Sequence, residues 1–340
     1  MINAAIVGAS GFTGLELTRI LNKHQFISKL DIYSFNNAGK TLSDFTKDSD
    51  IGNKKLLNFS ELDFDSYQII FFACPNGTAM KYIERVDLIK TKVIDLAADF
   101  RLDDEKVWEK FYEMKHQNPQ LLLGAIYGIP EINRDRIKEA KIIANPGCYP
   151  TAAILALYPL LKEKLIDVKS IIIDAKSGYS GAGRKKIDSE LGLKINENFI
   201  PYNFFKHRHK PEITQELSKI HKQDIDIIFS PQVLPIYRGI LETIYVNKNQ
   251  DITDEKIQKT YEKYYTNEKF INIEKSKHIE VKEVAFSNNV SISYHCDKSE
   301  KITIISAIDN LIKGAAGQAV QNMNIMMNFE ESTALINEQK

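Results

Sequence analysis

One cysteine, Cys148, stands where the surrounding residues would make a thiol reactive. It follows the apolar run 142–144 and an Asn-Pro-Gly turn, and Pro150 behind it suits the first turn of a helix. The helix predicted over 151–161 would therefore begin close to the sulfur. Free backbone N–H groups and the positive end of the helix dipole favour the thiolate, which is the nucleophilic form. The alternative is a small buried cysteine that only packs at a strand end.

Two histidines could serve such a thiol, His207 and His209, in the segment His-Arg-His-Lys-Pro-Glu-Ile over 207–213. A histidine transfers protons near neutral pH, and a thiol nucleophile needs a base beside it. We expect at least one of the two to be that base, although a basic surface loop would have the same composition. The other five histidines have no chemical neighbours in the sequence, and we expect structural or surface positions for them.

Two further segments could bind an anion. Ser177, Gly178, Gly181 and Arg184 lie in a Gly/Ser-rich loop after the strand predicted over 171–175, and such loops suit an oxyanion or a phosphate. Arg101 follows the strand predicted over 92–95, at the edge where open parallel sheets bind ligands. The alternatives are a flexible surface loop for the first segment and a surface ion pair for Arg101.

A glycine-rich turn near the N-terminus predicts a nucleotide site. Glycines at positions 8, 11 and 14 separate the strand predicted over 2–7 from the helix predicted over 15–23. Such a turn lets the backbone approach a pyrophosphate, which the helix N-terminus stabilises, although a plain strand–helix turn is the alternative. The residues of this turn that we expect to bind the cofactor are Gly8, Ser10, Gly11, Phe12, Thr13 and Gly14.

The end of the second predicted strand, 30–35, bears on the choice of cofactor. An NAD site usually places Asp or Glu there for the ribose 2′-OH, and positions 34–37 hold none. Ser34 and Lys40 could instead bind a 2′-phosphate, so we expect NADP rather than NAD. The alternative is a polar loop whose lysine is only solvated.

The elements that must position these residues fall into two sets. Up to residue 147, short apolar strands alternate with helices, which predicts a parallel sheet with crossover helices. Beyond Cys148, the runs 170–175, 226–234, 242–246, 279–285 and 291–296 have fewer helices between them, which favours a mixed or antiparallel sheet. A long helix is predicted over 309–327. We therefore expect an α/β protein with a Rossmann-type dinucleotide-binding domain, 1–147 with 309–340, and an α+β domain for catalysis, substrate binding and oligomerisation, 148–308.

Composition excludes several functional classes. The 340 residues are 43% hydrophobic and 26% charged, with 45 basic and 45 acidic side chains, so nothing favours a nucleic acid or an anionic membrane as partner. Three cysteines without a CxxC pair or a Cys/His cluster argue against a disulfide framework and a metal site, and Cys74 and Cys296 are expected to be inert. No signal peptide and no apolar run of about 20 residues is present. We expect a cytoplasmic protein.

Taken together, these motifs resemble the N-acetyl-gamma-glutamyl-phosphate reductase family of arginine biosynthesis, which is related to aspartate-semialdehyde dehydrogenase. The resemblance runs nearly end to end. It is most specific at Gly-Cys-Tyr-Pro-Thr over 147–151 and at His-Arg-His-Lys-Pro-Glu-Ile. It also covers 8–14, 38–40, 95–101, 127–131, 177–184 and 313–322.

The resemblance implies a reversible, NADP-dependent reduction of N-acetyl-L-glutamyl 5-phosphate to N-acetyl-L-glutamate 5-semialdehyde with release of phosphate. Cys148 would form a thioester, and His209 would be the acid/base. It implies a homodimer or homotetramer. Substrate binding is implied for Arg101, Arg184, Ser177, Gly178, His207, Arg208 and Glu212, and cofactor binding for Gly181, Asn310, Lys313 and Gly314 in addition to the glycine turn, Ser34 and Lys40.

One departure and two alternatives remain open. Many relatives carry Ser-Arg where this chain has Ser34-Phe35, and the arginine helps to hold the 2′-phosphate. A related enzyme acting on a carrier-linked aminoadipyl phosphate or on aspartyl phosphate would share the mechanism. A nucleotide-sensing protein without catalysis would share the scaffold, although Cys148 and His209 argue against it.

Overall fold

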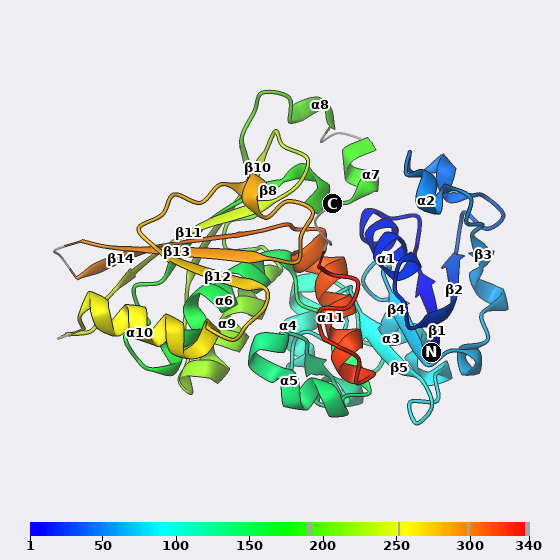
Figure 1. The fold of residues 1–340 in the computed structure, drawn as a ribbon, viewed down its shortest axis with the longest axis horizontal. Coiled ribbons are helices and arrows are strands. Elements are labelled where there is room, and N and C mark those ends of the chain that lie inside the picture. The colour runs from blue at the N-terminus through cyan, green and yellow to red at the C-terminus, as the bar shows by residue number, and fades with distance from the viewer. Residues whose placement is uncertain (189–191, 251, 298–299, 337–340) are drawn as a thin grey trace. The chain divides into compact units, whose positions relative to one another are not determined.

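The computed structural model describes residues 1–188, 192–250, 252–297 and 300–336, and the chain divides into two compact units (Figure 1). The first unit is Met1–Pro146 together with Ala315–Lys340, and the second is Gly147–Gly314. Cys148 is thus among the first residues of the second unit. The segment 309–314 also belongs to the second unit, whereas the sequence pattern placed the return to the first domain at 309.

A seven-stranded parallel sheet forms the centre of the first unit, in the order β3-β2-β1-β4-β5-β7-β6. Its middle strands are buried along most of their length, as a sheet covered on both faces requires. The predicted Rossmann-type parallel sheet is confirmed. The strands are β1 (Ile2–Val7), β2 (Ile27–Ser34), β3 (Leu57–Asn58), β4 (Ile69–Phe72), β5 (Lys92–Asp95), β6 (Ile126–Tyr127) and β7 (Ile142–Ala144).

Helices join these strands, and the C-terminal helix α11 packs against α1 and α5 within the same unit. Buried amides of α11 bond to that unit: Asn322 Nδ2 donates to the Gly128 carbonyl over 2.9 Å, and Asn324 Oδ1 lies 2.8 Å from His24 Nε2. The helices are α1 (Phe12–Asn22), α2 (Ser49–Gly52), α3 (Ala79–Tyr82), α4 (Glu105–Tyr112), α5 (Pro130–Glu139) and α11 (Gly317–Met326).

The second unit contains a seven-stranded mixed sheet in the order β12-β13-β14-β11-β8-β10-β9. Strands β10 and β8 pair in parallel, as do β12 and β13, and the other neighbours are antiparallel. The predicted mixed sheet is confirmed. The strands are β8 (Ile172–Gly178), β9 (Ile200–Pro201), β10 (Ile228–Leu234), β11 (Ile240–Asn247), β12 (Ile271–Lys275), β13 (Val290–Cys296) and β14 (Lys301–Ile308).

The strand predicted over 279–285 is wrong. Glu280 and Glu283 form a capping box around a short 3-10 turn, and Ile279 and Val284 pack against Ala307 instead of pairing with a neighbouring strand. A run that alternates apolar and charged residues can therefore bury its apolar side chains from a loop as well as from a strand. The edge strand that pairs with β13 is β12, which lies earlier in the chain.

The helix α6 (Cys148–Lys162) packs against β11, β14, α9 and α10 and is buried along nearly all of its length. Pro159 lies inside it and has no N–H to offer the Leu155 carbonyl. Tyr265 Oη donates to that carbonyl over 2.5 Å, so α10 supplies the missing bond. The other helices of this unit are α7 (Arg184–Lys186), α8 (Gly192–Lys194), α9 (His209–His221) and α10 (Asp254–Tyr265).

The helix predicted as one piece over 309–327 is wrong in its first third. The segment Ile312–Ala316 is a π-helical turn, and the α-helix begins only at Gly317. The Asp309 carboxylate accepts the N–H groups of Leu311 and Ile312, and the Gly314 N–H donates to the Asp309 carbonyl. The bond from Gly314 to Asp309 spans five residues instead of the four of an α-helix, which is the π-helical pattern.

Across the described ranges, no helix has the length and apolar character needed to span a membrane.

Candidate active site around Cys148

Cys148 is the first residue of a fifteen-residue helix. The chain leaves β7 through Asn145, Pro146 and Gly147, and the helix begins at Cys148 itself, earlier than predicted. The first N–H groups of such a helix have no intrahelical acceptor, and its first turn carries no acidic residue. The half-buried thiol therefore lies at the positive end of a helix dipole, which favours its ionised form.

Glu212 ties the start of α6 to the start of α9. Its Oε1 accepts the Gly147 N–H over 2.8 Å, and the side chain is 1% exposed. Because α9 begins at His209, this bond brings the first turn of α9 to the end of α6 that carries Cys148. The structure thus gives Glu212 a positioning contact. The substrate contact expected from the resemblance stays a prediction.

Both histidines of the 207–213 segment are buried against the tyrosine that follows the cysteine. The ring centroids of His207 and His209 lie 4.8 Å apart, and the Tyr149 ring lies 5.8 Å from each. Tyr202 completes the cluster, because its hydroxyl lies 3.3 Å from His207 Nε2 and donates to Tyr149 Oη over 3.4 Å. Tyr149 and Tyr202 were not among the predicted site residues. Their only sequence signal was a position close to Cys148 and to His207.

The two histidines differ in their hydrogen bonds and charge. His207 Nδ1 accepts the backbone N–H of His209 over 3.1 Å, which places the ring proton of His207 on Nε2. Burial, together with the positive charges of Arg208 and Lys186, lowers the pKa of His207 to about 3. A ring that stays neutral near pH 7 is poorly suited to exchanging protons there. His209 is therefore the better candidate for the acid/base.

The Gly/Ser loop uses its backbone N–H groups for internal bonds. The N–H groups of Gly178, Tyr179 and Ser180 donate to the carbonyls of Gly239, Ile236 and Tyr237. A Cβ on Gly178 would lie 2.7 Å from the Tyr237 carbonyl oxygen, so only glycine fits there. These three N–H groups are therefore not available to an anion, whereas the half-buried Arg184 guanidinium follows in the same loop.

The turn before α11 also comes to Cys148. A Cβ on Gly314 would lie 2.7 Å from Cys148 Cβ. Asn310 Nδ2 donates to Ser180 Oγ over 2.9 Å, and a Cβ on Gly181 would lie 3.7 Å from that same nitrogen. Lys313 is fully buried with its ammonium 5.8 Å above the Phe270 ring. Cofactor contacts of Gly181, Asn310, Lys313 and Gly314 stay predictions.

The glycine turn of the first unit fits a dinucleotide. Gly8 has φ +93°, and a Cβ there would lie 2.4 Å from the Ala73 carbonyl oxygen; a Cβ on Gly14 would lie 2.4 Å from the Gly8 carbonyl oxygen. Helix α1 has no side-chain cap at Gly11 and no acidic residue in its first turn. Its first N–H groups are thus suited to a pyrophosphate.

The end of β2 is tied to this turn. Ser34 Oγ accepts the Asn37 N–H over 3.2 Å, and Asn37 Nδ2 donates to Ser10 Oγ over 3.3 Å. Lys40 is exposed beside this loop, and Phe35 packs its ring 4.1 Å from the Phe59 ring. The loop therefore offers hydroxyl, amide and ammonium groups, and no carboxylate.

Arg101 is buried, which excludes the surface ion pair considered for it. Its Nε donates to the Asn145 carbonyl over 2.7 Å, and its Nη2 donates to the Leu96 carbonyl over 3.0 Å. It therefore holds the turn that leads out of β7. Its role as an anion binder stays a prediction.

The whole chain can be compared with known proteins. Residues 3–140 match the family described as "Semialdehyde dehydrogenase, NAD binding domain", and residues 148–310 match "Semialdehyde dehydrogenase, dimerisation domain". N-acetyl-gamma-glutamyl-phosphate reductase of Pelotomaculum thermopropionicum is 43% identical over 98% of this chain and 97% of the relative. The chain belongs to the N-acetyl-gamma-glutamyl-phosphate reductase family. The reductase of Campylobacter jejuni subsp. jejuni is 42% identical over 98% of both chains.

Solved structures place this reductase family member in a wider fold group. Aspartate semialdehyde dehydrogenase II of Vibrio cholerae superposes with a TM-score of 0.76 at 21% identity, over 96% of this chain and 98% of that one. The aspartate semialdehyde dehydrogenase of Candida albicans, solved with NADP, gives a TM-score of 0.70 at 16% identity, over 96% and 98% of the two chains. At these identities the likeness shows the fold alone.

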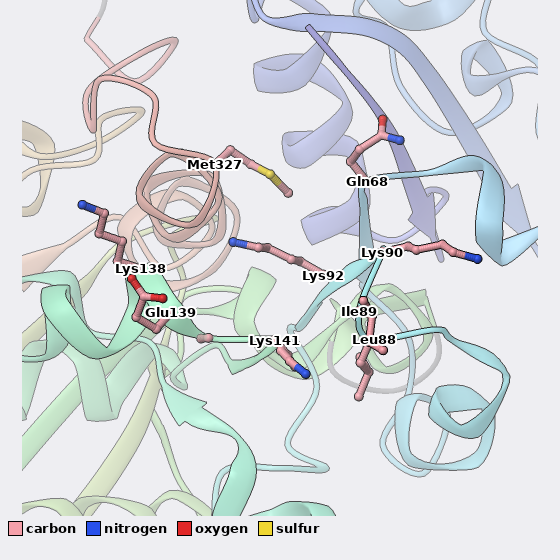
Figure 2. Close-up of a pocket in the computed structure, with 10 residues that line it drawn as sticks. Gln68, Leu88, Ile89, Lys90, Lys92, Lys138, Glu139, Lys141 and Met327 are labelled. Carbon is pink, nitrogen blue, oxygen red and sulfur yellow. The ribbon is translucent and has the colours of Figure 1, made fainter.

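The first unit has a pocket of about 320 Å³, and Figure 2 shows the residues that line it. Gln68, Lys92 and Lys141 line it at the N-terminal ends of β4, β5 and β7, whereas open parallel sheets bind ligands at the opposite edge. The Lys92 ammonium donates to the Met326 carbonyl at the end of α11. The pocket therefore lies beside the C-terminal end of α11, where Lys92 binds the carbonyl of its last residue. Within the described ranges, no group of His, Cys, Asp and Glu could hold a metal ion.

Proposed function

We propose that this reductase family member reduces N-acetyl-L-glutamyl 5-phosphate to N-acetyl-L-glutamate 5-semialdehyde and phosphate, through a thioester on Cys148 with NADPH. The observation that carries the proposal is the position of Cys148 at the start of α6, with His209 in the same ring cluster as Tyr149. The names of relatives 42–43% identical over nearly the whole chain support the substrate.

The cysteine and the histidine account for the covalent chemistry. His209 takes the proton of the Cys148 thiol, and the sulfur attacks the acyl carbon. The bond from that carbon to the phosphate oxygen breaks, and His209 returns the proton to the leaving phosphate. NADPH supplies, when bound, the hydride that converts the thioester to the aldehyde. The Cys148 thiolate then leaves the former acyl carbon and takes a proton from solution, which balances the reaction.

The proposal includes NADP in preference to NAD. Ser34, Asn37 and Lys40 would hold the 2′-phosphate, since no carboxylate in the 34–37 loop opposes it and the Lys40 ammonium is exposed. The glycine turn and the first N–H groups of α1 would hold the pyrophosphate.

The reverse reaction tests the proposed function directly. With N-acetylglutamate semialdehyde and phosphate, the wild-type protein should reduce NADP, Cys148→Ala should not, and Cys148→Ser should retain almost nothing, because a hydroxyl is a much weaker nucleophile near pH 7. Aspartate semialdehyde and a carrier-linked aminoadipate semialdehyde should give much lower kcat/KM. A folded, NADP-binding protein without turnover on the acetylated substrate would refute the proposal.

A homo-oligomer is part of the same proposal. Tyr245, Ile172 and Ile228 lie in one row across β11, β8 and β10, and they are 43%, 37% and 49% exposed. They alternate with residues buried on the opposite face, against which α6 packs. An apolar row on this face suits a second copy of the chain, in keeping with a match to a dimerisation domain. Light scattering at micromolar concentration should give the mass of a dimer or tetramer, and a monomer would contradict this.

A further inference from the structure

One buried ion pair of the second unit takes no part in the proposed chemistry. Arg238 Nη1 donates to Asp309 Oδ2 over 2.9 Å, and the two side chains are 9% and 0% exposed. The guanidinium also lies 4.0 Å from the centroid of the Phe286 ring. Removing one partner of such a pair leaves an uncompensated buried charge. The other bonds of Asp309 indicate what the pair holds in place.

The Asp309 carboxylate organises a tight turn. Its Oδ1 accepts the N–H groups of Leu311 and Ile312 over 2.8 and 3.1 Å, and its Oδ2 accepts the Phe286 N–H over 2.7 Å. The Asp309 carbonyl accepts the Gly314 N–H over 2.9 Å. The segment 309–314 is therefore bound to its own first residue at three points.

This turn ends against the cysteine. A Cβ on Gly314 would lie 2.7 Å from Cys148 Cβ and 3.3 Å from Ile308 Cδ1. The backbone of the turn thus packs directly on the Cys148 side chain. Any shift of the turn changes the space around the sulfur.

Asn310, the residue after Asp309, connects the turn to two other segments of the second unit. Its Oδ1 accepts the Gly239 N–H over 2.6 Å, and its Nδ2 donates to Ser180 Oγ over 2.9 Å. Asp309 therefore binds Arg238, and its neighbour Asn310 binds Gly239. The Ser180 segment, the Arg238 segment and the Gly314 turn form one hydrogen-bonded assembly.

We propose that Arg238 and Asp309 are positioning residues for Cys148. They hold the 309–314 turn against the cysteine and, through Asn310, hold the Ser180 segment. The proposal rests on the proposed function in taking Cys148 as the nucleophile. Neither residue touches the reacting atoms. Both act through Gly314 and Asn310, and a misplacement of about 1 Å in such a site costs turnover on the order of 10²-fold.

The test uses Arg238→Met, Asp309→Asn, their double variant and Arg238→Lys. Each of the first two removes one charge of the pair and leaves the other buried, and the double variant removes both charges. Arg238→Lys keeps the positive charge but loses the planar guanidinium, which bonds Asp309 and stacks on the Phe286 ring. The control is Lys263→Met, which breaks the 2.6 Å ion pair with Glu163 at the other end of α6, about 22 Å along the helix from Cys148.

Two measurements separate positioning from general loss of stability. The first is kcat and KM for phosphate-dependent NADP reduction. The second is the iodoacetamide alkylation rate of each cysteine, read by mass spectrometry of its peptide. Cys74 and Cys296 are internal controls, because burial raises the pKa of both thiols and neither touches the turn in the contacts described.

In Arg238→Met and Asp309→Asn, we expect kcat to fall about 10²-fold. Alkylation of Cys148 should accelerate about threefold or more, because the turn no longer covers its Cβ, and Cys74 and Cys296 should not change. Arg238→Lys should lie between these and the wild type. The double variant should lose less than the sum of the single losses, and Lys263→Met should match the wild type.

Two results would overturn the inference. One is kcat and Cys148 alkylation unchanged in all four variants. The other is faster alkylation of all three cysteines together with a lower Tm, which would assign the pair to overall stability. Alkylation needs no substrate, so a wild-type protein without turnover would refute the proposed function and still leave the positioning inference to be decided at Cys148.

Discussion

The backbone N–H of His209 donates a hydrogen bond to Nδ1 of His207 over 3.1 Å. The bond places the ring proton of His207 on Nε2, where the Tyr202 hydroxyl lies 3.3 Å away. Burial lowers the pKa of His207 to about 3, so this ring is uncharged from mildly acidic to alkaline pH. The two histidines are therefore not equivalent: the His207 ring accepts a hydrogen bond at the first turn of α9, and His209 is the acid/base that we propose.

The histidine variants should separate these roles. His209→Asn should lower kcat about 10²–10⁴-fold, which is the range for a lost acid/base, with little change in the Kd of NADP. His207→Asn should cost less, because it removes a hydrogen-bond acceptor and no titrating group. The reverse ranking would move the acid/base role to His207.

Glu212 provides a second comparison. Glu212→Ala leaves the buried Gly147 N–H without this acceptor, which should lower the free energy of unfolding by about 1–3 kcal/mol and lower kcat. Glu212→Gln keeps an oxygen in the same place and should restore most of both. Urea unfolding and steady-state kinetics measure the two effects. A KM for substrate that rises strongly in Glu212→Gln would instead assign the carboxylate to substrate binding.

Glu242 predicts how stability depends on pH. It is fully buried on the face of β11 that packs against α6, and neither carboxylate oxygen has a hydrogen-bond partner among the described residues. Burial raises its pKa well above the usual 4.5, against a smaller lowering by Lys176. Above that usual value the unfolded chain releases the proton and the folded chain keeps it, so this group lowers stability as pH rises.

Glu242→Gln should remove that loss. The two proteins should differ little at pH 4, where the acid is largely protonated in both states, and the Tm of the glutamine variant should move progressively above that of the wild type as pH rises beyond the usual value of 4.5. For each pH unit in this range, the free energy of unfolding of the wild type should fall by up to about 1.4 kcal/mol relative to the glutamine variant. Calorimetry at matched ionic strength measures the difference. Parallel Tm curves for the two proteins would show that Glu242 ionises normally.

Phe35 predicts a change in cofactor selectivity. Phe35 directly follows Ser34, the last residue of β2, and precedes Lys40 in the same loop. Its ring is 40% exposed and packs on Phe59. Phe35→Arg should tighten NADP binding by roughly 1 kcal/mol, or about fivefold, through the added charge near the 2′-phosphate. The Kd of NAD should stay the same. Phe35→Leu removes the ring without adding charge and is the matched control.

If Phe35→Arg and Phe35→Leu bind NADP equally, the 2′-phosphate does not lie at this loop. If the wild-type protein binds NAD as tightly as NADP, the proposed cofactor preference is wrong. Isothermal titration with both cofactors covers the three proteins in one series.

Local patterns in the sequence were sufficient for the parts of the molecule that depend on neighbours along the chain. The glycine turn requires residues without a Cβ at positions 8 and 14, and the Asn-Pro-Gly turn stops β7 just before a helix that starts at Cys148. Alternating and continuous apolar runs separated the mixed sheet from the parallel one. The ordered motifs were specific enough to indicate the reductase family.

Contacts between residues far apart in the chain were decided only by the tertiary structure. The run 279–285 alternates apolar and charged residues as a strand does, yet it is a loop in which only Ile279 and Val284 are buried against Ala307, because periodicity alone does not settle such short runs. The sequence could not show that the N–H groups of the Gly/Ser loop are used by residues 236–239. Nor could it show that Arg238 and Asp309, 71 positions apart, pair beside the turn that packs on Cys148. The sequence determines which groups can do chemistry, whereas packing decides which of them meet, since a buried polar group must take its partner from whatever the fold brings within reach.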